Sequence, residues 1–76
     1  MFKTTVLTPN RVLFEGKAWS VFLPGATGEF EVLEFHKSIV SLLQKGKIII
    51  DWDTEIPIRK GAMHMSNDKL VAIVEE

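Results

Sequence analysis

Apolar and polar residues alternate along the chain in short stretches, as they do in strands that have one buried face. Between residues 29 and 33, charged residues alternate with Phe30 and Val32, which we expect to point inward. Between residues 17 and 23 the stronger apolar set is Trp19, Val21 and Leu23, so we expect these to face inward as well. Nine segments fit a strand: residues 2–7, 11–14, 17–23, 29–33, 38–43, 47–52, 55–59, 62–65 and 69–75.

Turn-forming residues separate these segments. Glu15-Gly16 is expected to end the second one, and the richest turn signal lies at residues 25–28. Asp53-Thr54 is predicted to join two strands as a hairpin, and Asn67-Asp68 to form a tight turn before the last strand. Residues 38–43 also fit a helical stripe, but the segment is short for a helix, so strand is the favoured interpretation.

Short strands at this close spacing predict an all-β sandwich or barrel. A chain of 76 residues has room for a single domain, residues 1–76. Its hydrophobic fraction of 46% is too high for a disordered chain. Its apolar stretches are far shorter than the ~20 residues of a membrane helix, and its first residues lack the apolar core of a signal peptide. We therefore expect no direct insertion into a membrane.

Charge and cysteine content exclude several classes of function. Nine Lys and Arg residues against ten Asp and Glu residues leave a formal charge of −1, without the basic excess that phosphate binding needs, so nucleic acid is a disfavoured partner. The chain has no cysteine, which excludes disulfides, zinc–thiolate sites and thiol catalysis. An intracellular setting is the expectation that follows.

Two groups of residues are candidate metal ligands. His36 and His64 are 28 residues apart, and one histidine in each region does not supply three or four converging ligands. His64 is expected on the outer face of a strand. Asp51, Asp53 and Glu55 have the spacing with which an EF-hand loop begins, but the glycine required at the sixth position is missing. A solvated hairpin tip is the favoured interpretation, and we expect no metal.

Glu29, Glu31 and Glu34 form an acidic cluster around Phe30 and Phe35. Paired carboxylates serve as acid and base in glycoside hydrolysis, but that chemistry also needs a cleft, which so small a domain rarely encloses. A solvated strand face and a protein-contact loop are the two other interpretations. The sequence contains no nucleophile elbow and no phosphate-binding loop. We expect no catalytic residue and no cofactor.

Several motifs together resemble a known family, and their order and spacing cover essentially the whole chain. The family is the epsilon subunit of F-type ATP synthases. The motifs are Leu13-Phe14-Glu15-Gly16, Leu23-Pro24-Gly25-x-x-Gly28-x-Phe30, His36, the turn from Leu43 to Gly46, and Gly61 ahead of the last hairpin.

The resemblance implies a ten-stranded β-sandwich or flattened barrel in the central stalk of the enzyme. It implies a non-catalytic rotor subunit that binds the gamma subunit, rests on the ring of c subunits and couples rotation to ATP synthesis and proton transport. Such a subunit is peripheral, on the cytoplasmic side of the membrane. The alternative function, from another class, is a stand-alone small β-barrel adaptor that binds a peptide or an oligonucleotide; a free-standing enzyme is the third.

The resemblance also implies which residues contact the polar loops of the c-ring. By position these lie between Gly28 and His36, with Glu29 and His36 at the matching positions. The family usually has Gly-x-Leu-Pro-Gly-His-Ala-Pro here, whereas residues 31–38 of this chain have Glu at two of the four turn-forming positions and Phe and Ser at the other two. The expected c-ring contact consists of Glu29, Glu31, Glu34, Phe35 and His36.

Longer members of the family carry a two-helix region after the sandwich. The sequence ends at Glu76, where the resemblance places the end of the sandwich. Both a short form of the subunit and the first domain of a longer one are compatible with this length.

Overall fold

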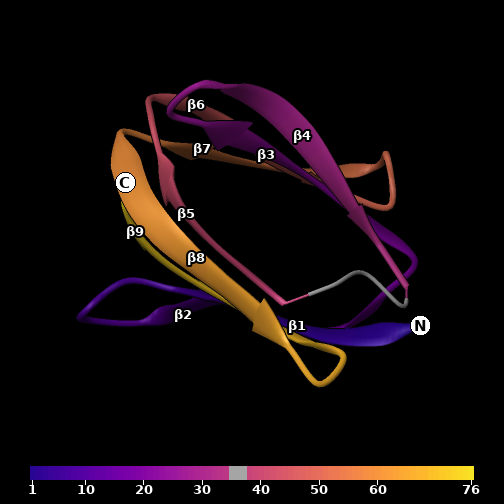
Figure 1. The fold of residues 1–76 in the computed structure, drawn as a ribbon. Coiled ribbons are helices and arrows are strands. Elements are labelled where there is room, and N and C mark those ends of the chain that lie inside the picture. Colours follow the sequence, from indigo (N-terminus) through magenta and orange to yellow (C-terminus); the bar gives the residue numbers. More distant parts are fainter. Residues whose placement is uncertain (35–37) are drawn as a thin grey trace.

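The computed structural model describes residues 1–34 and 38–76, and this part of the chain is all-β, as predicted (Figure 1). Within these residues no helix is long and apolar enough to span a membrane. The strands are β1 (Phe2–Leu7), β2 (Val12–Ala18), β3 (Ser20–Gly25), β4 (Gly28–Leu33), β5 (Ile39–Leu43), β6 (Gly46–Ile50), β7 (Thr54–Ile58), β8 (Lys60–Ser66) and β9 (Lys69–Glu75).

The described residues form nine strands, the number that the alternation predicts. The count of ten that the resemblance implied is wrong for this part of the chain. The described stretches between the strands are single residues or short turns, the longest being residues 8–11, and they are too short to add a strand to the ladder.

The strands form one sheet that folds over itself in the order β2-β1-β9-β8-β5-β3-β6-β7, with β4 paired to β3. β5 and β3 meet at the residue pair Leu43 and Gly25, where the sheet bends. This bend produces two layers: β4, β3, β6 and β7 form one, and β2, β1, β9, β8 and β5 form the other (Figure 1).

Apolar side chains fill the space between the layers. The alternation predicted for β4 is confirmed, because Val32 is buried and Phe30 packs against the core. Every second residue of β9 is buried as well. Because successive side chains of a strand point to opposite faces, this pattern places one face of each strand inside. The buried apolar residues are Phe2, Val6, Ala18, Val21, Leu23, Val32, Leu43, Ile48, Ile50, Ile56, Ile58, Met63, Met65, Leu70, Ala72 and Val74.

Two predictions about the second and third strands are wrong. β2 runs through Glu15-Gly16 to Ala18 because Gly16 stays in the ladder opposite Thr4, and the corner lies at Trp19 instead. Ala18 and Ser20 on either side of that corner are both buried, so Trp19 points outward with 62% of its surface exposed. A carboxylate oxygen of Asp51 holds the corner by accepting backbone N–H bonds from Trp19 at 2.7 Å and Ser20 at 3.0 Å.

The turn between β6 and β7 lies two residues earlier than predicted. Asp51 and Trp52 have φ values of 53° and 61°, and Asn67 and Asp68 have values of 51° and 58°. Two central residues with positive φ are typical of the type I′ turn that suits the twist of a hairpin. The prediction of a tight turn at Asn67-Asp68 is therefore confirmed. The predicted hairpin between β6 and β7 is also present, but its turn lies at residues 51–53 and Thr54 already belongs to β7.

Close packing explains the glycines in the motif around residues 23–30. A Cβ atom on Gly25 would lie 2.8 Å from the ring of Phe30, and one on Gly46 would lie 2.7 Å from Pro24. Backbone bonds join the two turns, because Gln44 N donates to the Pro24 carbonyl at 2.8 Å. Gly25, Gly46, Pro24 and Phe30 thus form one packed unit where the two layers meet.

Candidate functional site

The acidic residues predicted as a contact site lie on and just after β4. This strand pairs with β3 from Gly25↔Gly28 to Ser20↔Leu33, and in the described part of the chain its other edge has no partner strand. Glu29 and Glu31 are two residues apart, so they lie on the same face of β4. Charged side chains on an edge strand also protect it from pairing with other chains.

Contacts within the chain distinguish the three glutamates. The hydroxyl of Ser20 donates a 2.5 Å hydrogen bond to Glu31, and the N-terminal amine of Met1 forms an ion pair with Glu34. Among the described residues, Glu29 has no hydrogen-bonded or ionic partner, and its side chain is exposed. Of the three, Glu29 is therefore the carboxylate that is available to another molecule.

The structure does not bring the predicted residues to one point. Glu29 and Glu34 are five residues apart on an extended chain, which separates them by about 16 Å at 3.3 Å per residue. Phe35 and His36 lie outside the described residues. The c-ring contact therefore stays a prediction, and the described carboxylates form a line along one edge of a layer.

Sequence reasoning missed three exposed apolar residues around Glu34. Met1, Trp19 and Leu33 are 46%, 62% and 50% exposed, and they belong to three chain segments that meet here because Ala18 pairs with Phe2 and Ser20 with Leu33. We call these three residues the end patch. The alternation placed Trp19 inside, and no local signal shows that the chain turns a corner at this residue.

A second surface lies on the outward side of the layer formed by β2, β1, β9, β8 and β5. Outward residues in register across these strands form a row in which every member is apolar. Leu42 and Ile73 are 68% and 53% exposed, and Val40, in the next row, is 74% exposed. His64 is exposed beside Val40, as predicted. The apolar row consists of Val12, Leu7, Ile73, Ala62 and Leu42.

An open groove of about 530 Å³ lies at one end of this surface. Leu42, Ala62 and Ile73 of the apolar row line it together with Pro9. Gly61 contributes to its lining, and a Cβ atom there would approach the Ile73 carbonyl oxygen to 2.6 Å. The groove is thus a mostly apolar depression that can receive an apolar side chain from another molecule.

The acidic residues of the β6–β7 hairpin form hydrogen bonds or ion pairs within the chain. Asp51 clamps the corner at Trp19 and Ser20, as described above, and Glu55 pairs with Lys47 at 3.2 Å. Asp53 is exposed and accepts a bond from the Thr54 hydroxyl. The prediction of an exposed hairpin tip therefore holds for Asp53, whereas Glu55 is exposed within β7 and Asp51 stabilises the fold.

These features define a small β-sandwich with exposed apolar residues on the outer face of one layer and a line of carboxylates along the β4 edge of the other. The chain belongs to the family described as the beta-sandwich domain of the ATP synthase delta/epsilon chain, whose model matches residues 1–76. The resemblance stated from the sequence motifs is thereby confirmed.

Related proteins support the family assignment. The chain is 39% identical to the ATP synthase epsilon chain of Sulfurimonas denitrificans over 96% of its own length, but it spans only 59% of that relative. It is 27% identical to the ATP synthase epsilon chain of Chlorobium limicola over 99% of its length and spans 90% of that protein. The fold also matches a chain in the structure of the central stalk and c-ring of the Tetrahymena thermophila mitochondrial ATP synthase, with a TM-score of 0.78, 13% identity and coverage of 97% of this chain and 63% of that one.

Proposed function

We propose that this chain is a rotor component in the central stalk of an F-type ATP synthase, where it links the gamma subunit to the c-ring. The observation that carries the proposal is family membership over the whole chain. The fold adds support, because the matched structure is that of a central stalk and c-ring. A linking component needs two separate contact surfaces, and the outer face of one layer and the β4 edge of the other meet this need.

The gamma subunit is proposed to bind the outer face that carries the apolar row. Val40, Leu42 and Ile73 expose large apolar side chains close together, and contiguous apolar surface of this kind marks protein contacts. The groove beside Leu42 and Ile73 offers a place for one apolar anchor of the partner, where interface energy concentrates.

The c-ring is proposed to bind along β4 and the segment that follows it. Glu29 supplies an unpaired carboxylate among the described residues, and the end patch adds apolar surface near Glu34. Phe35 and His36 complete the proposed contact by their position in the sequence. A partly wet interface of this kind uses charge for specificity and association rate more than for affinity.

In this role the chain transmits torque and performs no chemistry of its own. It couples rotation to ATP synthesis while it stays peripheral to the membrane, on the cytoplasmic side. Its own work is mechanical: the rigid sandwich, closed by the packed unit of Gly25, Gly46, Pro24 and Phe30, holds two partner surfaces at a fixed separation.

Capture of the ATP synthase tests the proposal. The tagged chain is incubated with detergent-extracted membranes of its source organism, and bound gamma and c subunits are identified by mass spectrometry. Leu42→Asp should abolish most of the capture of gamma, whereas Trp52→Asp should not. Trp52 is the matched control because it is 69% exposed against 68% for Leu42, and aspartate tolerates its positive φ. Capture of neither gamma nor c subunits by the wild-type chain would refute the proposal.

A further inference from the structure

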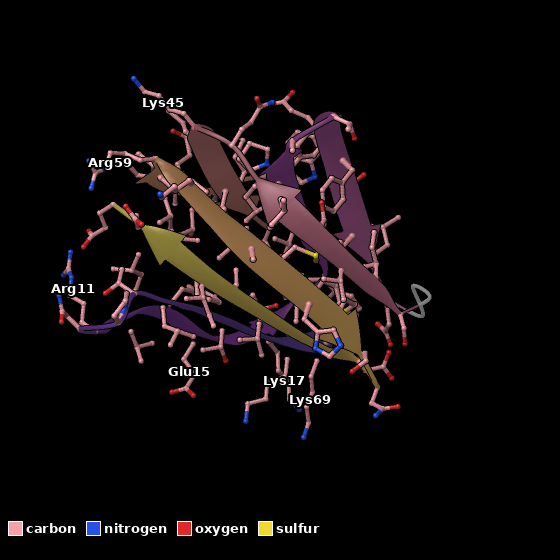
Figure 2. All side chains as sticks on the ribbon, turned by 60° about the vertical axis from the view of Figure 1, so that its left-hand side comes forward. Arg11, Glu15, Lys17, Lys45, Arg59 and Lys69 are labelled. Atoms are coloured by element: carbon pink, nitrogen blue, oxygen red, sulfur yellow. The ribbon has the colours of Figure 1, made fainter. Side chains whose placement is uncertain are left out.

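Three lysines lie side by side on the outer face, at the end opposite the groove. Lys3 on β1 pairs directly with Lys17 on β2 and with Lys69 on β9. All three are exposed, and Figure 2 shows Lys17 and Lys69 projecting from the same side of the molecule. With neighbouring strands about 4.8 Å apart, the Cα atoms of the three lysines span about 10 Å across the strands. We call Lys3, Lys17 and Lys69 the lysine row.

In the described part of the chain, none of the three lysines of the lysine row forms an ion pair. The ion pairs found in this part of the chain involve the N-terminal amine, Arg11, Lys47, Arg59 and Lys60 instead. The nearest carboxylates by sequence, Glu15 and Asp68, form no ion pair with the row. Three positive charges are therefore gathered on one strip of a chain whose formal charge is −1.

This arrangement costs folding stability. Like charges directly opposite each other on neighbouring strands repel, and Lys3 faces such a neighbour on both sides. The presence of three adjacent lysines that destabilise the isolated domain is explained if a partner places carboxylates against them. The lysine row shares its face with the apolar row, four residues away along β1, which is about 13 Å.

We propose that the lysine row binds a carboxylate-rich stretch of the gamma subunit. Resting on the proposed function, this inference adds the chemistry of the partner surface. The segment of gamma that covers the outer face carries apolar side chains over the groove and at least two acidic side chains about 13 Å away, over Lys3 and its neighbours. The two ends of the face fix the direction in which gamma docks, because a reversed segment would place its carboxylates on the apolar row.

The test compares Lys3→Glu with Lys45→Glu. Lys45 is an exposed lysine between β5 and β6, on the far side of the molecule from the lysine row (Figure 2), so both variants make the same change of charge. Affinity for the gamma-containing catalytic head is measured by surface-immobilised titration, and thermal stability by calorimetry. Lys3→Glu should weaken binding about tenfold at about 0.1 M salt, with much less difference from wild type at about 1 M salt. Lys45→Glu should bind like the wild type.

Stability separates a binding role from a structural one. Lys3→Glu places a carboxylate between two lysines, so the isolated variant should melt at the same temperature as the wild type or higher, while binding more weakly. Weaker binding together with a lower melting temperature would overturn the inference, because the lysine would then act through the fold.

The remaining outcomes are also decisive. Equal affinities of Lys3→Glu and Lys45→Glu, with wild-type binding intact, would overturn the lysine-row inference and leave the proposed function standing. A wild-type chain that does not bind the gamma-containing head would overturn both. Binding of the wild type, but not of Lys3→Glu, to vesicles of phosphatidylglycerol and phosphatidylcholine, with gamma binding unchanged between them, would assign the row to a membrane surface instead.

Discussion

Ser20 on β3 holds Glu31 on β4 through a hydrogen bond of 2.5 Å from its hydroxyl to the carboxylate. Glu31 lies opposite Phe22 in the ladder, so Ser20 is its diagonal neighbour on the paired strand. Ser20 is buried and also anchors the corner that Asp51 clamps. Glu31 thus belongs to the fold, whereas Glu29, two residues earlier, faces solvent without a partner among the described residues.

This difference predicts opposite results for the two glutamates. Glu29→Ala should change the free energy of unfolding by less than about 0.5 kcal/mol, because an exposed, unpaired side chain contributes little. Glu31→Ala should lower it by about 1 kcal/mol, since the variant leaves the buried Ser20 hydroxyl without its acceptor. For a domain of this size the second change corresponds to a fall of roughly 4 to 8 °C in melting temperature by calorimetry.

A double-mutant cycle with Ser20→Ala checks the assignment. The combined Ser20→Ala and Glu31→Ala variant should be less destabilised than the sum of the two single variants, because both remove the same bond. Strict additivity would show that the two side chains do not interact in solution.

Charge reversal at Glu29 should weaken assembly with the c-ring. Glu29→Lys replaces attraction to polar or basic loops with repulsion, and the defect should shrink as salt rises, because exposed charges are screened over about 10 Å at about 0.1 M salt. The measurement is the amount of chain retained on purified ATP synthase stripped of its own subunit. Glu55→Lys is the control for the same change of charge, because β7 and β4 are opposite edges of the same layer. It also removes the ion pair with Lys47, but both side chains of that pair are exposed, so the loss costs little stability.

The retention of Glu29→Lys and Glu55→Lys distinguishes a specific contact at the β4 edge from an effect of net charge. Normal retention of Glu29→Lys at low salt would remove Glu29 from the c-ring contact. Equal loss in both variants would show that net charge, and not the β4 edge, governs retention. Adding Glu31→Lys would confuse the test, since that change also removes the bond to Ser20.

The sequence predicted the strands well because alternation is a local signal. Phe30, Val32 and the inward residues of β9 follow from the period of two alone. The outward position of Trp19 could not be predicted, because it depends on Asp51, a residue 32 positions away that accepts its backbone N–H. A hydrogen bond from a residue so distant in the sequence does not alter the pattern of apolar and polar residues around Trp19.

Part of the candidate site could also be predicted from the sequence. The acidic cluster stands out in the sequence, but the pairing of Glu31 with Ser20 requires the register of the β3–β4 hairpin. The short turn between Gly25 and Gly28 fixes that register, so this contact was within reach of sequence reasoning. The apolar row was not, because it combines residues of five strands whose order, with parallel β1 and β9 in the middle, is set by tertiary packing.

A buried hydroxyl in the core offers a stabilising substitution. The Thr4 side chain is fully buried on β1, and its oxygen has no hydrogen-bond partner among the described residues. Thr4→Val has nearly the same shape and removes the unsatisfied polar atom, so it should raise the free energy of unfolding by about 1 kcal/mol. Chemical denaturation should show a higher midpoint with an unchanged slope. A lower midpoint would mean that the hydroxyl has a partner in solution, such as an ordered water.

Two glycines provide the last prediction, because the same substitution should have different effects at each. A Cβ atom on Gly25 would lie 2.6 Å from the Gly28 carbonyl oxygen, which is backbone and cannot move aside, whereas one on Gly16 would approach no closer than 3.6 Å, to the Phe14 ring. Gly25→Ala should therefore destabilise the domain by about 1 to 3 kcal/mol, as overpacking does. Gly16→Ala should be neutral or slightly stabilising, because alanine restricts the unfolded chain more than glycine does. Denaturation midpoints of the two variants measure this difference directly.

Phe30→Leu in the Gly25→Ala background relieves the contact with the ring but not the one with the Gly28 oxygen, so it should recover only part of the loss. Full recovery would show that the ring alone dictates glycine at this position, and equal stability of the two alanine variants would show that the turn can shift to accept a side chain.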